Sequence, residues 1–290
     1  MHPAPSVIFF TAFSGLGFGL LAWLGIGLPP VSGWVAFVFY LLGYGMAVGG
    51  LLASVFHLGN KKNAIKAFSQ WRSSWLSREG VMAVVSLLTM APYAFAQVFL
   101  DLTLRPLGVL GALFCLITVF TTSMIYTQLK TVPRWNTPLT PVLFLLFSLA
   151  GGALFAGQIR PAAALLAALG VLQVIAWIQG DAKGQTGDST IETATGLGRI
   201  GKTRLLEPPH SGQNYLLSEM AYTVGRKHSL KLRFIALIFA VILPVILLLA
   251  LPVTHLVALV AVASHLVGLL AARWLFFAEA AHVVRLYYGK

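Results

Sequence analysis

The sequence predicts an all-α integral membrane protein with eight transmembrane helices. Three observations support this fold class: the 290-residue chain is 58% hydrophobic, only 10% of its residues are charged, and its apolar runs are as long as a membrane crossing. Soluble domains are about 25% charged, and a run of ~20 apolar residues is typical of a transmembrane helix. The mean hydropathy of +0.85 belongs to the same class.

Eight apolar segments are long enough to cross a bilayer core of about 30 Å as helices. Prolines punctuate several of their ends, as expected where a helix cannot continue. We treat residues 1–290 as one membrane domain with spans at 7–28, 31–56, 80–100, 106–129, 138–157, 161–179, 232–251 and 253–284. The last segment is too long for one crossing, so its end, from about Arg273, is expected to emerge as an interfacial helix.

The basic residues predict the orientation. Eight crossings place both termini on one side of the membrane, together with the loops at 57–79, 130–137 and 180–231. Of the 20 Lys and Arg residues, only Arg105 and Arg160 fall on the other side. The positive-inside rule then places the termini and the large loops in the cytoplasm. The net charge of +12 therefore fits orientation and docking better than nucleic-acid binding.

The loop at 180–231 is the longest polar segment, and it is too short and irregular for a domain with its own core. A cytoplasmic docking surface for a partner subunit is the expected role, with a disordered linker as the alternative. The loop contains a G-x-G-x-x-G pattern at 196–201. No strand or βαβ unit accompanies this pattern, so a dinucleotide site is not expected.

Glycine pairs four residues apart occur in the first two spans, at Gly15 and Gly19 and at Gly45 and Gly49. Small residues at this spacing let helix backbones approach closely. Ordinary packing glycines explain the pairs equally well. Either reading concerns assembly of the helices and not chemistry.

The candidate chemistry lies where the second span ends and the third begins. His57 and Glu79 stand at these two positions, and ionisable groups at membrane depth are usually functional. Reducing a quinone takes two electrons and two protons. A histidine can donate a hydrogen bond to a quinone carbonyl and deliver a proton, and a nearby carboxylate can replace that proton from water. The alternative is that both residues only anchor helix ends.

Metal and haem sites have little support. Cys115 is the one cysteine, so the chain can hold neither an iron–sulfur cluster nor an internal disulfide, and no bound metal is expected. His255, His265 and His282 share the last span, whereas haem b needs two histidines at similar depth on facing helices. His57 and His282 could pair in this way, so a haem-bearing cytochrome b is one alternative.

A transporter is a further alternative function. A transporter would show inverted repeats and polar groups at the membrane midplane, and the sequence has little of either. Four ionisable residues near the end of the chain are expected to form a solvated or partner-facing surface, with part of a functional site as the alternative: Arg273, Glu279, His282 and Arg285.

The chain resembles the membrane anchor subunits of the dimethyl sulfoxide reductase type, a family that serves molybdenum oxidoreductases. The resemblance covers nearly the whole chain and depends on the order of several short stretches together. These stretches are Met1-His2-Pro3-Ala4, His57-Leu58-Gly59, residues 71–79, Tyr126 with Thr131-Val132-Pro133-Arg134-Trp135, Gln179-Gly180, Pro208-Pro209-His210 and residues 273–280. The long sixth loop and the last two stretches look most like the branch that serves a cytoplasmic membrane-bound sulfite dehydrogenase.

This resemblance implies a multi-pass protein of the bacterial inner membrane that is not itself catalytic for the substrate. It implies a docked four-cluster iron–sulfur subunit, a molybdopterin catalytic subunit and electrons passing from sulfite oxidation to ubiquinone or menaquinone. The alternative within the family is a quinol-oxidising anchor of a sulfoxide or other respiratory reductase.

The resemblance also links the histidine of His-Leu-Gly and the glutamate that starts the next helix to quinone, and these match His57 and Glu79. His57 would bind and protonate the headgroup, and Glu79 would relay protons. The aromatic residues would wall the pocket or lie under the docked subunit, and the arginines would tune charge or bind the partner. The predicted quinone-binding set is His57, Gly59, Trp71, Arg72, Trp75, Ser77, Arg78 and Glu79.

Overall fold

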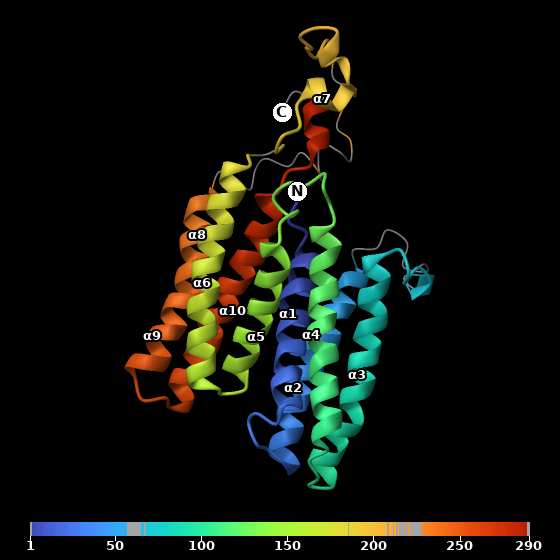
Figure 1. The fold of residues 1–290 in the computed structure, drawn as a ribbon. Coiled ribbons are helices and arrows are strands. Elements are labelled where there is room, and N and C mark those ends of the chain that lie inside the picture. The colour runs from blue at the N-terminus through green and yellow to red at the C-terminus, as the bar shows by residue number, and fades with distance from the viewer. Residues whose placement is uncertain are drawn as a thin grey trace.

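The computed structural model describes residues 2–56, 65–66, 68–184, 186–207, 209–210, 212, 214, 220 and 228–288. The described residues form helices and contain no strand. Six helices occupy the first two thirds of the chain: α1 (Pro5–Gly25), α2 (Gly33–Val55), α3 (Trp75–Phe99), α4 (Arg105–Thr127), α5 (Leu139–Phe155) and α6 (Ile159–Ala182). All six run along a common direction in the bundle of Figure 1.

The last third contains one interrupted helix, one continuous helix and several short turns. The interrupted helix consists of α8 (Ser229–Leu237), the π-helical turn η5 (Ile238–Ile242) and α9 (Leu243–Ala250). Helix α10 (His255–Ala278) continues without interruption past Arg273 and ends at Ala278. The short elements are α7 (Ile191–Thr195), η2 (Leu197–Arg199) and η6 (Val283–Tyr288).

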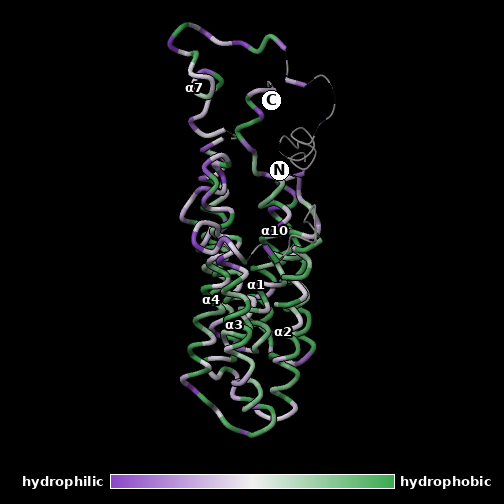
Figure 2. The backbone as a smooth tube through the Cα atoms, turned by 90° about the vertical axis from the view of Figure 1, so that its right-hand side faces the viewer, coloured by the Kyte–Doolittle hydropathy of each residue, from purple (hydrophilic) through white to green (hydrophobic). Residues whose placement is uncertain are grey.

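Seven helices among the described residues are long and apolar enough to cross a membrane, counting 229–250 as one, and α5 is a shorter apolar helix of 17 residues. Apolar residues dominate the bundle along its length, whereas hydrophilic residues gather around α7, as Figure 2 shows. Both termini lie at the α7 end of the bundle (Figure 1). The protein is therefore a multi-pass helical membrane protein.

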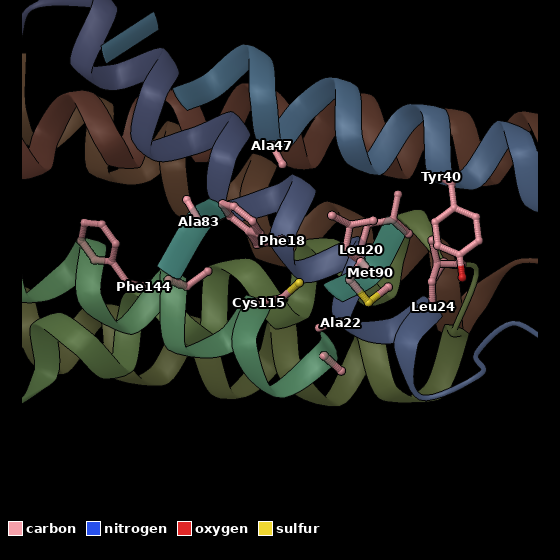
Figure 3. Packing of buried hydrophobic residues seen from close by; sticks show 14 of the residues in the cluster. Phe18, Leu20, Ala22, Leu24, Tyr40, Ala47, Ala83, Met90, Cys115 and Phe144 are labelled. Carbon is pink, nitrogen blue, oxygen red and sulfur yellow. The ribbon is translucent and has the colours of Figure 1, made fainter. Parts of the chain in front are cut away.

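Helix α1 lies at the centre of the bundle and packs against α2, α4 and α5. It connects two apolar cores. One core is formed mainly by α1, α2, α3 and α4 (Figure 3), and the other lies between α5, α6, α8, α9 and α10 and includes Leu16 of α1. Because both cores use α1, the two halves of the bundle form one packed body.

Small residues allow α1 to approach its neighbours closely. A Cβ on Gly17 would lie 2.2 Å from the backbone nitrogen of Ala47 in α2, and a Cβ on Gly19 would lie 1.9 Å from the carbonyl oxygen of Ser148 in α5. By contrast, a Cβ on Gly45 or Gly49 would meet no atom within 4 Å. The glycine pair in α2 therefore does not form the α1–α2 contact.

Candidate functional site

The start of α3 is held by one arginine. Arg78 donates hydrogen bonds from Nε to the carbonyl oxygen of Trp71 at 3.0 Å and from Nη2 to that of Arg72 at 2.7 Å. Its guanidinium also lies over the Trp75 ring, 4.3 Å from the centroid. These two carbonyl groups precede the helix and would otherwise need water as a hydrogen-bond donor. Arg78 supplies the donors instead and thereby fixes the segment 71–75 against the first turn of α3.

The aromatic residues of this segment occupy two environments. Trp75 packs edge-on against Phe120 of α4, with ring centroids 6.2 Å apart. Trp71 is 54% exposed and has the Arg72 guanidinium over its ring at 5.5 Å. An exposed aromatic ring beside two cations forms a surface that a partner or a ligand can cover.

Glu79 lies on the inner side of α3 and is only 4% exposed. Its Oε1 accepts a hydrogen bond from Thr122 Oγ1 of α4 at 2.7 Å. No ion pair to Glu79 occurs among the described residues, where the ion pairs join other carboxylates. A buried carboxyl group with a hydroxyl donor and no cation beside it is suited to gaining and losing a proton.

A line of hydroxyl groups leads inward from Glu79 between α3 and α4. The hydroxyl of Thr122 also bonds the carbonyl oxygen of Thr118 at 3.0 Å, and Thr118 Oγ1 donates to Ser86 Oγ at 3.4 Å. Thr118, Thr122 and Ser86 are all buried. These contacts fix the side chain of Thr122 and thereby the hydrogen bond that holds the Glu79 carboxyl group.

An aromatic cluster joins the C-terminal end of α4 to α5 and α10. Tyr126 of α4 is at its centre. Its ring centroid lies 5.2 to 5.8 Å from those of four neighbours, Trp135, Phe144, Phe276 and Phe277. Such ring contacts stabilise the packing between these three helices.

Four charged residues from separate segments form a closed ring of ion pairs near the same end of the bundle. Arg134 and Arg233 both contact Glu279, at 2.8 and 2.6 Å respectively. The same two arginines contact Asp181, at 3.0 and 2.6 Å. Each carboxylate is therefore shared by two guanidinium groups, and each guanidinium connects α6 to the end of α10.

The expected solvated surface near the end of the chain is wrong, because Arg273 and Glu279 are both buried. Sequence spacing placed them correctly on one segment but could not show their neighbours. The counter-charges of Glu279 come from Arg134 and Arg233, which are far from it in sequence. Arg273 instead lies over the Phe144 ring, 3.8 Å from the centroid.

The structure brings together part of the predicted quinone-binding set. Trp71, Arg72, Trp75 and Arg78 form one contact group before and in the first turn of α3. Ser77 and Glu79 are buried on the inner side of the same turn. His57 and Gly59 lie outside the described residues. Thr122, which no sequence pattern indicated, joins the site through its hydrogen bond to Glu79.

His265 and His282, two of the three histidines that follow residue 250, lie in different surroundings. His265 is fully buried, and its Nδ1 contacts the carbonyl oxygen of Ala240 at 2.8 Å, in the π-helical turn η5. A Cβ on Gly151 would lie 3.0 Å from His265 Nε2, so α5 packs directly against this ring. His282 Nδ1 accepts the backbone N–H of Val284 at 3.0 Å, and the His57–His282 pairing lies outside the described residues.

Comparison with known proteins identifies the family. The profile described as "DMSO reductase anchor subunit (DmsC)" matches residues 6–289. A sulfite dehydrogenase subunit of Allochromatium vinosum is 32% identical over 329 aligned positions, which cover 99% of each chain. No solved structure matches the chain. The match over nearly its whole length shows that the chain belongs to the DMSO reductase anchor subunit (DmsC) family.

Proposed function

We propose that this chain is the membrane anchor through which a molybdenum and iron–sulfur oxidoreductase passes electrons to the quinone pool. The observation that carries the proposal is the buried Glu79 carboxyl group, held by Thr122 at the start of α3 in a chain of the anchor family. Ionisable groups at this depth are costly unless they are paired or functional. Glu79 has no cationic partner among the described residues, which favours function.

The proposed reaction is the reduction of a quinone by two electrons and two protons to the quinol. Electrons come from the partner subunits. His57, which follows the C-terminal end of α2, donates a hydrogen bond and a proton to a quinone oxygen, and Glu79 returns a proton to it. The segment of Trp71, Arg72, Trp75 and Arg78 borders the headgroup, while Ser77 lies beneath it.

Sulfite is the proposed electron donor of the complex. This assignment comes from the relative that is 32% identical, whose name makes it part of a sulfite dehydrogenase. Oxidation of the donor takes place on a different polypeptide, so this chain contributes the quinone step alone. The proposed partners are a four-cluster iron–sulfur subunit and a molybdopterin catalytic subunit.

We place these partners on the cytoplasmic side of a bacterial inner membrane. Counting α5 as a crossing gives eight spans, since its 17 residues extend about 25 Å and are flanked by polar turns. Both termini and the loops at 57–79, 130–137 and 180–231 then share one side, with 18 of the 20 basic residues. That distribution favours the cytoplasm.

The test uses the purified complex and two electron acceptors. In the His57→Ala variant, quinone-coupled turnover should be lost, while turnover with an artificial acceptor that takes electrons directly from the iron–sulfur subunit should persist. The matched control is His255→Ala, because His255 is exposed at the start of α10. Retention of quinone-coupled turnover by the His57 variant would contradict the proposed site.

A further inference from the structure

A cavity of about 60 Å³ lies between α5, α6 and α10, and Arg134 and Glu279 of the ion-pair ring form part of its wall. Its walls include Phe144 and Phe147 from α5, Trp177 from α6 and Arg273 from α10. The ends of these helices meet at the same end of the bundle as the chain termini (Figure 1). The cavity is larger than one water molecule requires, so it can admit a small polar group.

Arg273 is the unusual member of this wall. The residue is only 4% exposed, and its Nε has no hydrogen-bond partner among the described residues. Its neighbours are the faces of Phe144 and Phe147, 3.8 and 5.0 Å from the guanidinium carbon. Aromatic faces compensate a buried cation only in part, because they accept no conventional hydrogen bond.

The nearby carboxylates are already occupied. Glu279 is held by Arg134 and Arg233 at 2.8 and 2.6 Å, and Asp181 is held by the same two arginines. The cavity wall also includes Lys183 and Gln173, which supply further donors. The balance of charge around the cavity therefore favours an anion that supplies oxygen acceptors to Arg273.

The location narrows the class of anion. Tryptophans concentrate at the boundary between lipid tails and headgroups, and Trp177 forms part of this cavity. Basic pockets between transmembrane helices near this boundary bind acidic lipid headgroups. Apolar side chains of α5 and α6 line the same cavity and can contact an acyl chain.

We propose that this cavity binds the phosphodiester of an acidic glycerophospholipid, with Arg273 as its main ligand and Lys183 and Gln173 as further donors. The lipid would join α5, α6 and α10 beside the ion-pair ring. This proposal is independent of the quinone site, because no residue that lines the cavity belongs to the predicted quinone-binding set. Inorganic phosphate offers the same oxygen acceptors, so the test must separate the two sources.

The experiment measures phosphatidylglycerol binding to the purified full chain by native mass spectrometry and by thermal midpoint in nanodiscs. The wild type should retain phosphatidylglycerol in preference to phosphatidylcholine and melt at a higher temperature when it is present. Arg273→Met should weaken retention by about tenfold or more and remove the thermal effect. Arg273→Lys, which keeps the charge, should restore part of both.

Two further variants keep the test decisive if Arg273→Met fails to fold. Ala176→Leu fills the cavity and keeps every charge, so it should also lose the lipid. Arg160→Met removes one cation from the exposed opposite end of α6 and should behave as wild type. Lipid retention at the wild-type level by both the Arg273→Met and the Ala176→Leu variants overturns the site. A full thermal effect from inorganic phosphate in phosphatidylcholine nanodiscs overturns the lipid assignment.

Discussion

Two buried glutamates near the same end of the bundle have opposite surroundings. Glu79 accepts one hydrogen bond from a threonine and contacts no cation among the described residues, whereas Glu279 contacts two guanidinium groups at 2.6 and 2.8 Å. A carboxylate between two arginines connects structural elements. A buried carboxyl group with a hydroxyl donor alone has no cation to hold it ionised, so it can take up and release a proton. Burial alone therefore does not distinguish a chemical role from a structural one.

The largest expected effect comes from removing the exchangeable proton. Glu79→Gln keeps the shape of the side chain and can still accept the hydrogen bond from Thr122. We expect quinone-coupled turnover to fall by about a hundredfold or more, the usual contribution of a positioned acid or base, with little change in thermal midpoint. Steady-state assays on the purified complex measure this.

The matched control for that variant is Glu207→Gln. It makes the same glutamate-to-glutamine change at a residue that is exposed. It should leave both acceptor assays unchanged. A Glu79→Gln complex with wild-type quinone turnover would show that this carboxyl group is structural, as Glu279 is.

The second effect falls on stability. Glu279→Gln leaves Arg134 and Arg233 with Asp181 as their one shared carboxylate, and the loss of the charged hydrogen bonds to Glu279 should cost about 2–3 kcal/mol. The thermal midpoint of the detergent-solubilised chain measures this loss. Turnover per folded complex should fall equally with quinone and with the artificial acceptor, and a selective loss with quinone would contradict a structural role.

A smaller effect is expected at the other carboxylate of the ring. Asp181 contacts the same arginines, but its side chain is 50% exposed and water screens the interaction. Asp181→Asn should therefore cost less than about 1 kcal/mol, and added salt should reduce the difference from wild type. An effect as large as that of Glu279→Gln would mean that the ring acts as one unit.

The smallest effect is a pH dependence beside Glu279. Burial lowers the pKa of His282 below its ordinary value of 6.5, and the neutral ring accepts the N–H of Val284. The folded protein thus binds fewer protons than the unfolded chain, so this contribution is present above about pH 6.5 and is lost as pH falls through the lower pKa.

The measurement for His282 compares thermal midpoints at about pH 7.5 and about pH 5.5. His282→Asn keeps an acceptor for Val284 without titrating, so its midpoint should change less over this range than that of wild type. Equal pH dependence in the two proteins would assign the effect to other groups.

The fold was largely predictable from the sequence, and the reason is physical. A membrane crossing needs a long apolar run, so hydropathy alone locates α2, α4 and most of α6 to within a few residues. The interior pairing was not predictable in the same way. Arg134, Asp181, Arg233 and Glu279 come from four segments, and only the packed bundle shows that their charges meet.

The candidate site shows the same division. The position of Glu79 at the start of a span indicated a functional carboxyl group, and the structure adds its burial and its partner Thr122. Thr122 was not predicted because hydroxyl residues are common in transmembrane helices and bond their own backbone. The glycine pair at 45 and 49 fits a packing pattern, yet neither glycine contacts a neighbouring helix.

Photolabelling with an azido-quinone tests the central claim most directly. The purified complex is labelled with and without excess unlabelled quinone, and the modified peptides are mapped. We predict that the labels suppressed by excess unlabelled quinone lie within residues 57–79 or the first turns of α3. The yield of these labels should fall strongly in the Glu79→Gln variant. If the labels that excess quinone suppresses were confined to the cavity between α5, α6 and α10, with none near Glu79, the proposed site would be contradicted.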